Sequence, residues 1–267
     1  MSLTVTSWNV NSIKARLPNV LDWLKENKPD VACLQELKCQ DENVPRMELE
    51  DLGYNVETVG QKSYNGVALL SRLPIEEVAL RALPALDGLG EDDDQARYIE
   101  AVVAAGTGPV RVACLYAPNG NPAPGPKFDY KLAWLKRLNA HAAKLLKLEE
   151  PVILAGDYNV IPRDVDVHEP EKWKEDALFL PESRDALYAI RWLGYADAFE
   201  QADGRAHQYT FWDYQGGAWA RGHGIRIDHL LLSPKAADAL EGVEIDKAAR
   251  GKEKASDHAP ITATFDL

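Results

Sequence analysis

Acidic and amide side chains follow apolar segments at several points along the chain. Asn9 comes after the first such segment and Glu36 after the second, while Asp157 and Asn159 follow a later one. Asparagine and aspartate are also ordinary turn formers, so each position alone has a bland structural explanation. Asp228 is harder to explain in this way, because it interrupts an apolar run, where a carboxylate has to be paired or bound to a metal. Together these residues predict a polar site at one edge of a sheet.

Three further residues add groups that suit phosphodiester cleavage. Tyr116 ends another apolar segment, and Asp257 and His258 introduce the last one. A hard divalent cation takes oxygen ligands, polarises a phosphate and stabilises charge on the leaving oxygen. A carboxylate or an imidazole can position and deprotonate water, while neutral amide and phenol groups hold the phosphoryl oxygens. The residue types therefore predict metal-assisted hydrolysis of a phosphodiester.

Apolar patterning places most of these residues at the ends of strands. We expect strands at residues 3–8, 31–34, 54–59, 67–71, 98–104, 110–116, 152–155, 225–232 and 259–265. Helices with one apolar face are expected at residues 17–24, 128–145 and 187–193. Several strands follow one another without an intervening helix, so a purely parallel doubly wound sheet fits poorly. The prediction is an α/β fold in which two mainly antiparallel sheets pack together and helices flank them.

Length and composition favour a single domain that spans residues 1–267. The chain is 46% hydrophobic, and no linker-like or low-complexity segment divides it. Its formal net charge of −12 argues mildly against tight, non-specific binding to DNA. A DNA substrate is still compatible with this charge, because net charge says little about the local potential at a site.

The N-terminal sequence and the cysteines indicate a soluble cytoplasmic protein. There is no signal-peptide pattern and no apolar run of transmembrane length, so we expect no membrane association. The three cysteines, Cys33, Cys39 and Cys114, are an odd number without metal-ligand spacing, which is typical of a reducing compartment. No segment stands out as an interface, so a monomer is expected.

Eight short motifs run through the chain from Trp8 to Pro260. They are Trp-Asn-Val-Asn (8–11), Leu-Gln-Glu (34–36), Asn-Gly-Val-Ala (65–68), Tyr-Ala-Pro-Asn-Gly (116–120), Gly-Asp-Tyr-Asn (156–159), Phe-Trp-Asp-Tyr (211–214), Arg-Ile-Asp (226–228) and Ser-Asp-His (256–258). Each motif alone is weak, but in this order and spacing they resemble exonuclease III and its abasic-site endonuclease relatives, within the endonuclease/exonuclease/phosphatase superfamily. The resemblance implies a four-layered α/β sandwich with the site at one edge of the sheets.

The same resemblance implies a role for each polar residue. Glu36 would be the principal Mg²⁺ ligand, with Mn²⁺ as a substitute ion, and Asp157 would orient or deprotonate the attacking water. Asp228 would hydrogen-bond His258, which contacts the scissile phosphate. Binding of the phosphate is implied for Asn9, Tyr116 and Asn159. Assistance at the metal or the water is implied for Asp157, Asn159, Asp257 and His258.

The segment that contains Phe211 and Trp212 resembles the aromatic pocket that receives a flipped-out abasic sugar or packs against a DNA end. Similar sequences often have Trp before Phe at this point, so the pocket is expected to differ in shape. Ile225 and Arg97 are the other expected substrate contacts. His168 lies in the loop after the Gly-Asp-Tyr-Asn motif, where it either narrows the pocket or is simply an exposed histidine.

The implied function is Mg²⁺-dependent DNA repair on double-stranded DNA with abasic sites or 3′ ends. The reactions would be incision 5′ to an abasic site, 3′-to-5′ exonuclease activity and removal of 3′-phosphates. One alternative is a phosphodiesterase of the same fold whose substrate is a phosphoinositide or sphingomyelin. The aromatic segment 211–214 argues against this alternative. Another is a catalytically silent relative that binds nucleic acid, which would have degenerate metal and base positions. None is degenerate here: Glu36, Asp157, Asn159, Asp228 and His258 are all present.

Overall fold

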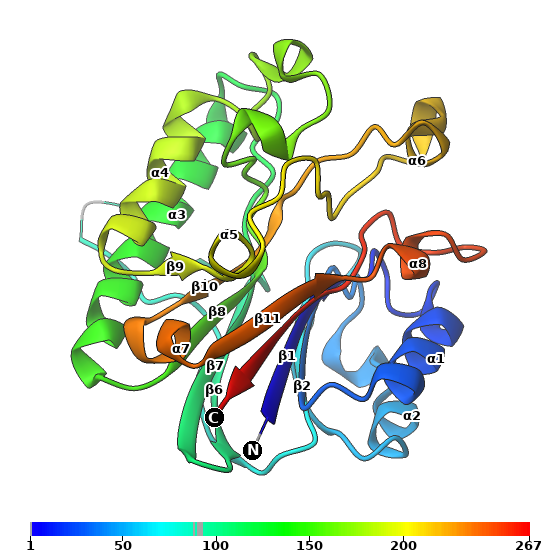
Figure 1. The fold of residues 1–267 in the computed structure, drawn as a ribbon, viewed down its shortest axis with the longest axis vertical. Coiled ribbons are helices and arrows are strands. Elements are labelled where there is room, and N and C mark those ends of the chain that lie inside the picture. The colour runs from blue at the N-terminus through cyan, green and yellow to red at the C-terminus, as the bar shows by residue number, and fades with distance from the viewer. Residues whose placement is uncertain (1, 88, 90–92) are drawn as a thin grey trace.

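Two six-stranded sheets lie face to face in the computed structural model, which describes residues 2–87, 89 and 93–267 (Figure 1). The first sheet has the spatial order β11 (Leu240–Ile245), β12 (Ile261–Asp266), β1 (Ser2–Asn9), β2 (Val31–Gln35), β4 (Val67–Ser71) and β3 (Asn55–Val59). The second has the order β5 (Ile75–Leu80), β6 (Tyr98–Ala105), β7 (Gly108–Tyr116), β8 (Val152–Asp157), β10 (Asp228–Leu232) and β9 (Ala196–Asp197).

Helices cover the outer faces of both sheets. The first sheet is covered by α1 (Leu17–Asn27) and α2 (Arg46–Glu50), and the second by α3 (Pro126–Leu145) and α4 (Pro181–Trp192) (Figure 1). Shorter helices lie in the connections: α5 (Ala198–Ala202), α6 (Ala218–Arg221), α7 (Pro234–Asp238) and α8 (Lys247–Arg250). Among the residues that the structure describes, no helix has both the length and the apolar character needed to cross a membrane.

Strand β2 shows why the central strands read as continuous apolar runs. Successive side chains of a strand point to opposite faces of its sheet. Val31 and Cys33 belong to the core between the two sheets, whereas Ala32 and Leu34 pack in a second core beneath α1 and α2. Every residue of β2 is therefore buried. The predicted four-layered α/β sandwich is confirmed.

Strand pairing is mainly antiparallel, as predicted. In the described part of the chain, β1 with β2 and β7 with β8 are the parallel pairs, and all other pairs are antiparallel. Parallel strands end at the same edge of a sheet, so β1 and β2 end together in one sheet and β7 and β8 in the other. Residues at these four strand ends can therefore meet at one edge of the sandwich.

The predicted strand at 225–232 is wrong at its beginning. Regular pairing with β8 starts at Asp228, while Ile225 forms single bridges with Phe211 and Val167. The reason is a competing partner, because the Arg226 N–H donates to the Asp166 carbonyl at 2.8 Å. The edge strands β5, β9 and β11 were not expected, since edge strands are only partly buried and lack a long apolar run.

Candidate active site

The polar residues singled out in the sequence meet where the two sheets end together. Asn9 ends β1 and Glu36 directly follows β2, both in the first sheet. In the second sheet Asp157 pairs with Tyr116 on one side and with Asp228 on the other. The Asn9 side-chain amide donates to Glu36 Oε1 and to Asp157 Oδ2, both at 2.9 Å, and so joins the two sheets. We call the following residues the edge cluster: Asn9, Glu36, Tyr116, Asp157, Asp228 and His258.

The backbone around the edge cluster adopts sparsely populated conformations. Glu36 has φ 56° and Asn159 has φ 50°, both in the left-handed region that residues with a side chain rarely adopt. Such conformations persist where the surrounding structure enforces them, often at functional sites. Gly156 has a different constraint, because a Cβ there would lie 2.0 Å from the carbonyl oxygen of Leu115 on β7. The close approach of β7 and β8 thus explains the glycine before Asp157.

The Glu36 carboxylate is held ionised by three donors. Its Oε1 accepts from the Asn9 amide and from the Tyr116 hydroxyl, both at 2.9 Å, and its Oε2 lies 2.7 Å from Lys38 Nζ. Burial raises the pKa of Glu36, but the charge of Lys38 and the hydrogen bonds from Asn9 and Lys38 outweigh this effect, so the pKa lies below its usual value. Its side chain is still 17% exposed. Glu36 is therefore an ionised carboxylate that solvent can reach.

His258 lies between two buried carboxylates. Its Nδ1 is 2.8 Å from Asp228 Oδ2, and its Nε2 is 3.8 Å from Asp157 Oδ2. Burial lowers the pKa of His258, but Asp228 and then Asp157 raise it to about 10. Burial and the neighbouring charge of Asp228 raise the pKa of Asp157 to about 7. The imidazole is thus cationic at neutral pH, beside a carboxylate that exchanges a proton in the same range.

The donor set fits a hard divalent cation. One ligand-capable atom from each of Asp157, Asp228 and His258 lies within 4.8 Å of the others, and Asp228 Oδ1 is buried without a hydrogen-bond partner among the described residues. A protonated His258 already places one positive charge in this trio. Glu36 presents the more accessible oxygens, which are the ligands that Mg²⁺ prefers. The geometry therefore favours Glu36 as the first place for a cation, and it adds Asp228 to the carboxylates that could share it.

Asn159 is fixed from several directions. Its N–H donates to Asp157 Oδ1 at 2.9 Å, and its Oδ1 accepts from the Asn119 amide at 3.3 Å. The ammonium of Lys131, on α3, donates to the carbonyls of Asn159, Asn119 and Ala177 at 2.6, 3.0 and 3.1 Å. One fully buried lysine thus ties together three loop segments at the rim of the site. Asn159 is thereby presented beside Asp157, as the sequence predicts.

Of the two aromatic residues expected to contact substrate, Phe211 lies at the site. Its ring meets the His258 ring edge-on with the centroids 5.0 Å apart. Ile225 is buried in the same apolar cluster as Phe211. Trp212 is only 3% exposed and packs in another cluster, edge-on to Trp219 with the centroids 4.9 Å apart. The structure therefore brings Phe211 to the edge cluster and places Trp212 in the packing behind it.

Arg97 and Asp257 both lie beside the edge cluster. The Arg97 guanidinium is 5.0 Å from the centre of the Tyr116 ring, and its Nη1 donates to the Tyr116 carbonyl at 3.2 Å. Arg97 therefore supports Tyr116, and a contact with DNA stays a prediction. Asp257 Oδ1 accepts from the Asn11 amide at 3.0 Å. Its side chain is half-buried, beside His258 in sequence.

His168 is neither fully exposed nor part of the edge cluster. Its ring stacks on His223 with the centroids 3.6 Å apart, and its side chain is 33% exposed. It lines a hollow of about 580 Å³ together with Trp212 and Trp219, among others. The expectation that His168 narrows the substrate pocket stays a prediction.

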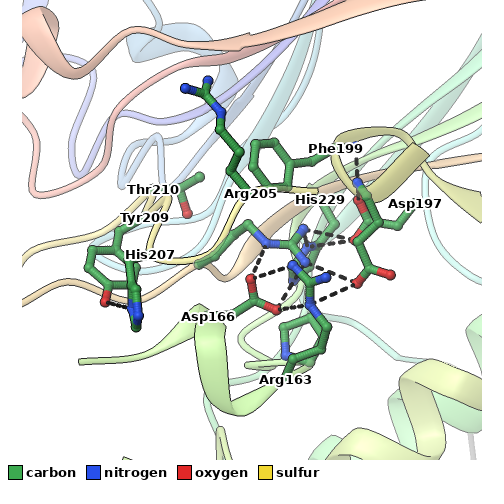
Figure 2. Close-up of polar contacts among 12 residues, drawn as sticks. Arg163, Asp166, Asp197, Phe199, Arg205, His207, Tyr209, Thr210 and His229 are labelled. Carbon is green, nitrogen blue, oxygen red and sulfur yellow. Dashed lines mark hydrogen bonds and ion pairs between the residues drawn. The ribbon is translucent and has the colours of Figure 1, made fainter. Parts of the chain in front are cut away.

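A second polar network lies directly beside Asp228, and we call it the arginine cluster: Arg163, Asp166, Asp197, Glu200, Arg226 and His229 (Figure 2). Arg226 is fully buried at its centre and donates to Asp166 at 3.0 and 3.2 Å, to Asp197 at 2.8 Å and to Glu200 at 3.2 Å. Burial raises the pKa of Asp197, but Arg226 outweighs this and holds it well below the usual range. These contacts fix Arg226 and His229, which lie on either side of Asp228 in the sequence.

Several charged residues described above had no predicted role, among them Lys131, Arg226 and Lys38. Lys131 could have been noticed, because it lies on the predicted apolar face of helix 128–145, three residues after Phe128 and four before Leu135. Arg226 is part of a quoted motif, but its partners lie 60, 29 and 26 residues away and no local pattern indicates them. Lys38 gives no local signal, since a lysine after a strand is usually solvated.

Fold and site together define a class of protein: phosphoester hydrolases built as a four-layered α/β sandwich, with a carboxylate-rich site at the edge of the sheets. The sequence profile of the Endonuclease/Exonuclease/phosphatase family matches residues 6–258. The chain belongs to this family. The resemblance to exonuclease III and abasic-site endonucleases is confirmed by relatives along the full length of the chain.

Two relatives and two solved structures illustrate the match. Exodeoxyribonuclease III of Haemophilus influenzae is 33% identical, with 97% of this chain and 98% of the relative covered. DNA repair nuclease APEX1 of Danio rerio is 30% identical, with 98% of this chain and 81% of the relative covered. The 3′ phosphatase NExo from Neisseria, bound to a product DNA hairpin, is 38% identical with a TM-score of 0.93 over 99% and 100% of the chains. An AP endonuclease from Archaeoglobus fulgidus is 36% identical with a TM-score of 0.92 over 99% and 100%.

Proposed function

We propose that this chain is a Mg²⁺-dependent phosphodiesterase of DNA repair, which incises DNA 5′ to abasic sites and processes 3′ ends. The observation that carries the proposal is the Asn9 amide, which joins Glu36 of one sheet to Asp157 of the other, beside the pair of Asp228 and His258. The relatives support the substrate class, since their names describe an exodeoxyribonuclease, a DNA repair nuclease and a 3′ phosphatase.

In this proposal Asp157 is the group that orients and deprotonates the attacking water. Burial and the charge of Asp228 raise its pKa to about 7, where a carboxylate can both accept and release a proton at neutral pH. The cationic His258, held by Asp228, binds an oxygen of the scissile phosphate. Asn159, whose amide nitrogen has a second hydrogen beside the one given to the Ala117 carbonyl, donates to the phosphoryl group as its negative charge grows. Asn9 and Tyr116 donate to it when it displaces their contacts with Glu36 and Asp157.

Glu36 is the proposed principal ligand of Mg²⁺, with Mn²⁺ as a substitute, and Asp157, Asn159, Asp257 and His258 lie around the same place. When bound, the cation would supply Lewis-acid stabilisation of the phosphate and of the leaving oxygen. The support is the chemistry of the donor set, an ionised and partly exposed carboxylate among others that are buried.

DNA is proposed to lie across the edge cluster with Phe211 against the damaged nucleotide. Phe211 presents an apolar ring next to the His258 imidazole, and Ile225 extends the same apolar surface beneath it. A nucleotide that is unstacked from the duplex needs such walls. Arg97 would act through Tyr116, and Trp212 would act through the packing of the 211–214 segment.

We further propose a single-domain monomer in the cytoplasm, in keeping with three buried free cysteines.

The test uses two labelled duplexes incubated with the purified protein and Mg²⁺. One carries an internal abasic-site analogue and the other a recessed 3′-phosphate. Cleavage of either duplex, abolished by EDTA and by Asp157→Asn, is the expected result, and the faster substrate identifies the dominant repair reaction. No reaction on either would overturn the DNA assignment. Phospholipid headgroups would then be the next substrates, and binding of DNA without cleavage would indicate a silent relative.

A further inference from the structure

Lys38 has no role in the chemistry proposed above, yet it contacts the carboxylate that is proposed to bind the metal. Its ammonium lies 2.7 Å from Glu36 Oε2, and the two side chains are 30% and 17% exposed. The other donors to Glu36, Asn9 and Tyr116, are neutral and bind the opposite oxygen, Oε1. Lys38 is therefore the one cation that contacts this carboxylate in the described part of the chain.

A second acceptor for the same ammonium lies nearby. Lys38 Nζ also donates to Asn11 Oδ1. The orientation of the Asn11 amide is fixed, because its nitrogen donates to Asp257 Oδ1 at 3.0 Å and leaves the oxygen for Lys38. Asn11 is neutral, so its oxygen can keep the ammonium when the Glu36 carboxylate is engaged elsewhere.

The charge balance around the site explains why an internal cation is needed. The carboxylates of Glu36, Asp157, Asp228 and Asp257 gather within one network of contacts. His258 lies against Asp157 and Asp228, which leaves Glu36 to Lys38. An ammonium and a divalent cation on the same oxygen repel each other, and this repulsion is strong at a partly desolvated site.

We propose that Lys38 is the internal counter-ion of the metal site, holding Glu36 Oε2 when no divalent cation is bound and retreating to Asn11 Oδ1 when one binds. The inference rests on the proposed function, in which Glu36 binds the metal. Lys38 thereby weakens divalent-metal affinity and keeps the metal exchangeable. A lysine suits this task, because its compact charge sits on a long flexible stem.

The test is a calorimetric titration of the DNA-free protein with Mg²⁺, comparing wild type, Lys38→Met and Lys38→Arg. Lys38→Met keeps the shape of the stem and removes the charge, so we expect Mg²⁺ to bind about tenfold more tightly. Lys38→Arg keeps the charge and should stay within about threefold of wild type. If Lys38 instead orients Glu36 for the metal, Lys38→Met would bind Mg²⁺ more weakly, and that result would overturn the proposal, as would an unchanged affinity.

Lys14→Met is the matched control. Lys14 is exposed and donates to Asn43 Oδ1 at 3.1 Å. The variant removes the same charge without touching Glu36, so its Mg²⁺ affinity should stay within about twofold of wild type. Equal tightening in Lys14→Met and Lys38→Met would mean that only the net charge matters, and it would overturn the specific role of Lys38.

Thermal unfolding gives a second readout that does not involve DNA. Without Mg²⁺, Lys38→Met leaves Glu36 uncompensated and should melt below wild type, whereas saturating Mg²⁺ should remove the difference. Lys38→Gln replaces Lys38→Met if the latter does not fold. If wild type itself binds no Mg²⁺, the metal part of the proposed function falls together with this proposal. If wild type binds Mg²⁺ and Lys38 has no effect, only this proposal falls.

Discussion

The edge cluster and the arginine cluster are two dense polar networks that share one short segment of chain. Asp228 belongs to the first, and Arg226 and His229, its close neighbours in sequence, belong to the second. Both networks are largely buried, and both combine carboxylates with a histidine. They differ in how their charges are balanced, and this difference separates a structural site from a reactive one.

The arginine cluster is closed. Arg226 contacts Asp166, Asp197 and Glu200. Arg163 contacts Asp166 at 2.8 and 3.0 Å (Figure 2). The pKa of Asp166 is lowered, because Arg163 and Arg226 outweigh the effect of its burial. The Asp166 and Asp197 carboxylates are ionised and paired with fixed guanidinium groups, so neither is left to react with a substrate.

The edge cluster is open. Asp157 and Asp228 share the single cation of His258, the pKa of Asp157 is raised to about 7, and Asp228 Oδ1 has no partner among the described residues. A buried excess of carboxylates destabilises the folded protein unless a proton or a metal compensates it. The edge cluster is therefore reactive because the protein leaves its charges unbalanced there.

The largest expected effect is that of Asp157→Asn on activity. Loss of the proposed base should lower kcat on the order of 10⁴-fold, the upper end of general-base effects. Because the substitution also removes repulsion with Asp228, the free energy of unfolding should stay the same or rise. Steady-state kinetics and urea unfolding of the same preparation measure both. A parallel loss of stability would erase the distinction between the two clusters.

Arg226→Met should have the opposite profile and the next largest effect. Removal of one partner leaves buried carboxylates uncompensated, so we expect the free energy of unfolding to fall by about 3–5 kcal/mol. Arg163→Met is the control, because Arg163 is 28% exposed and Asp166 would keep Arg226. The free energy of unfolding of Arg163→Met should fall by only about 1 kcal/mol. Equal losses in urea unfolding would show that Arg226 is not the centre of the cluster.

Tyr116→Phe tests a neutral donor of the edge cluster. It removes the hydroxyl that meets Glu36 Oε1 at 2.9 Å, and kcat should fall by roughly 10²-fold through loss of one donor. Tyr195→Phe is the matched control, since the Tyr195 hydroxyl donates to the Ala142 carbonyl at 3.1 Å beneath α3. That variant should lose about 1 kcal/mol of stability and keep its activity. Comparable losses of kcat in both variants would contradict the assignment of Tyr116.

The smallest expected effect is the pH dependence of metal-free stability. Asp157 has its pKa raised to about 7, so the folded protein holds a proton that the unfolded chain releases near pH 4, and stability falls between these values as pH rises. His258, with its pKa raised to about 10, adds stability below about pH 6.5 that is lost towards pH 10.

Because Asp157 and His258 share protons, we expect only a small decline as the pH rises. The free energy of unfolding should fall by roughly 1 kcal/mol, which lowers the melting temperature by a few degrees. Saturating Mg²⁺ should flatten the profile, since a cation favours the ionised carboxylates. Asp157→Asn should abolish the decline between about pH 4 and 7. If the melting temperature of the metal-free wild type does not fall relative to that of Asp157→Asn between about pH 5 and 7, Asp157 is ionised throughout.

The sequence by itself determined the layers and the membership of the edge cluster. Continuous apolar runs such as β2 require cover on both faces, which gives two sheets between helices. A single polar residue at the end of such a run can be explained as a turn former. Acidic and amide residues at the ends of several runs are not explained in this way, so together they predicted a shared site. Local patterns sufficed here, because strand ends and burial are set by neighbouring residues.

Tertiary structure alone decided which charges are paired. The Asn9 contact with Asp157 spans 148 residues, and the Arg226 contact with Asp166 spans 60. It also decided that Phe211 faces His258 while Trp212 packs behind it, and that regular pairing in β10 begins at Asp228. The physical reason is that electrostatic balance depends on distances of a few ångströms between segments, which exist only once the two sheets have packed.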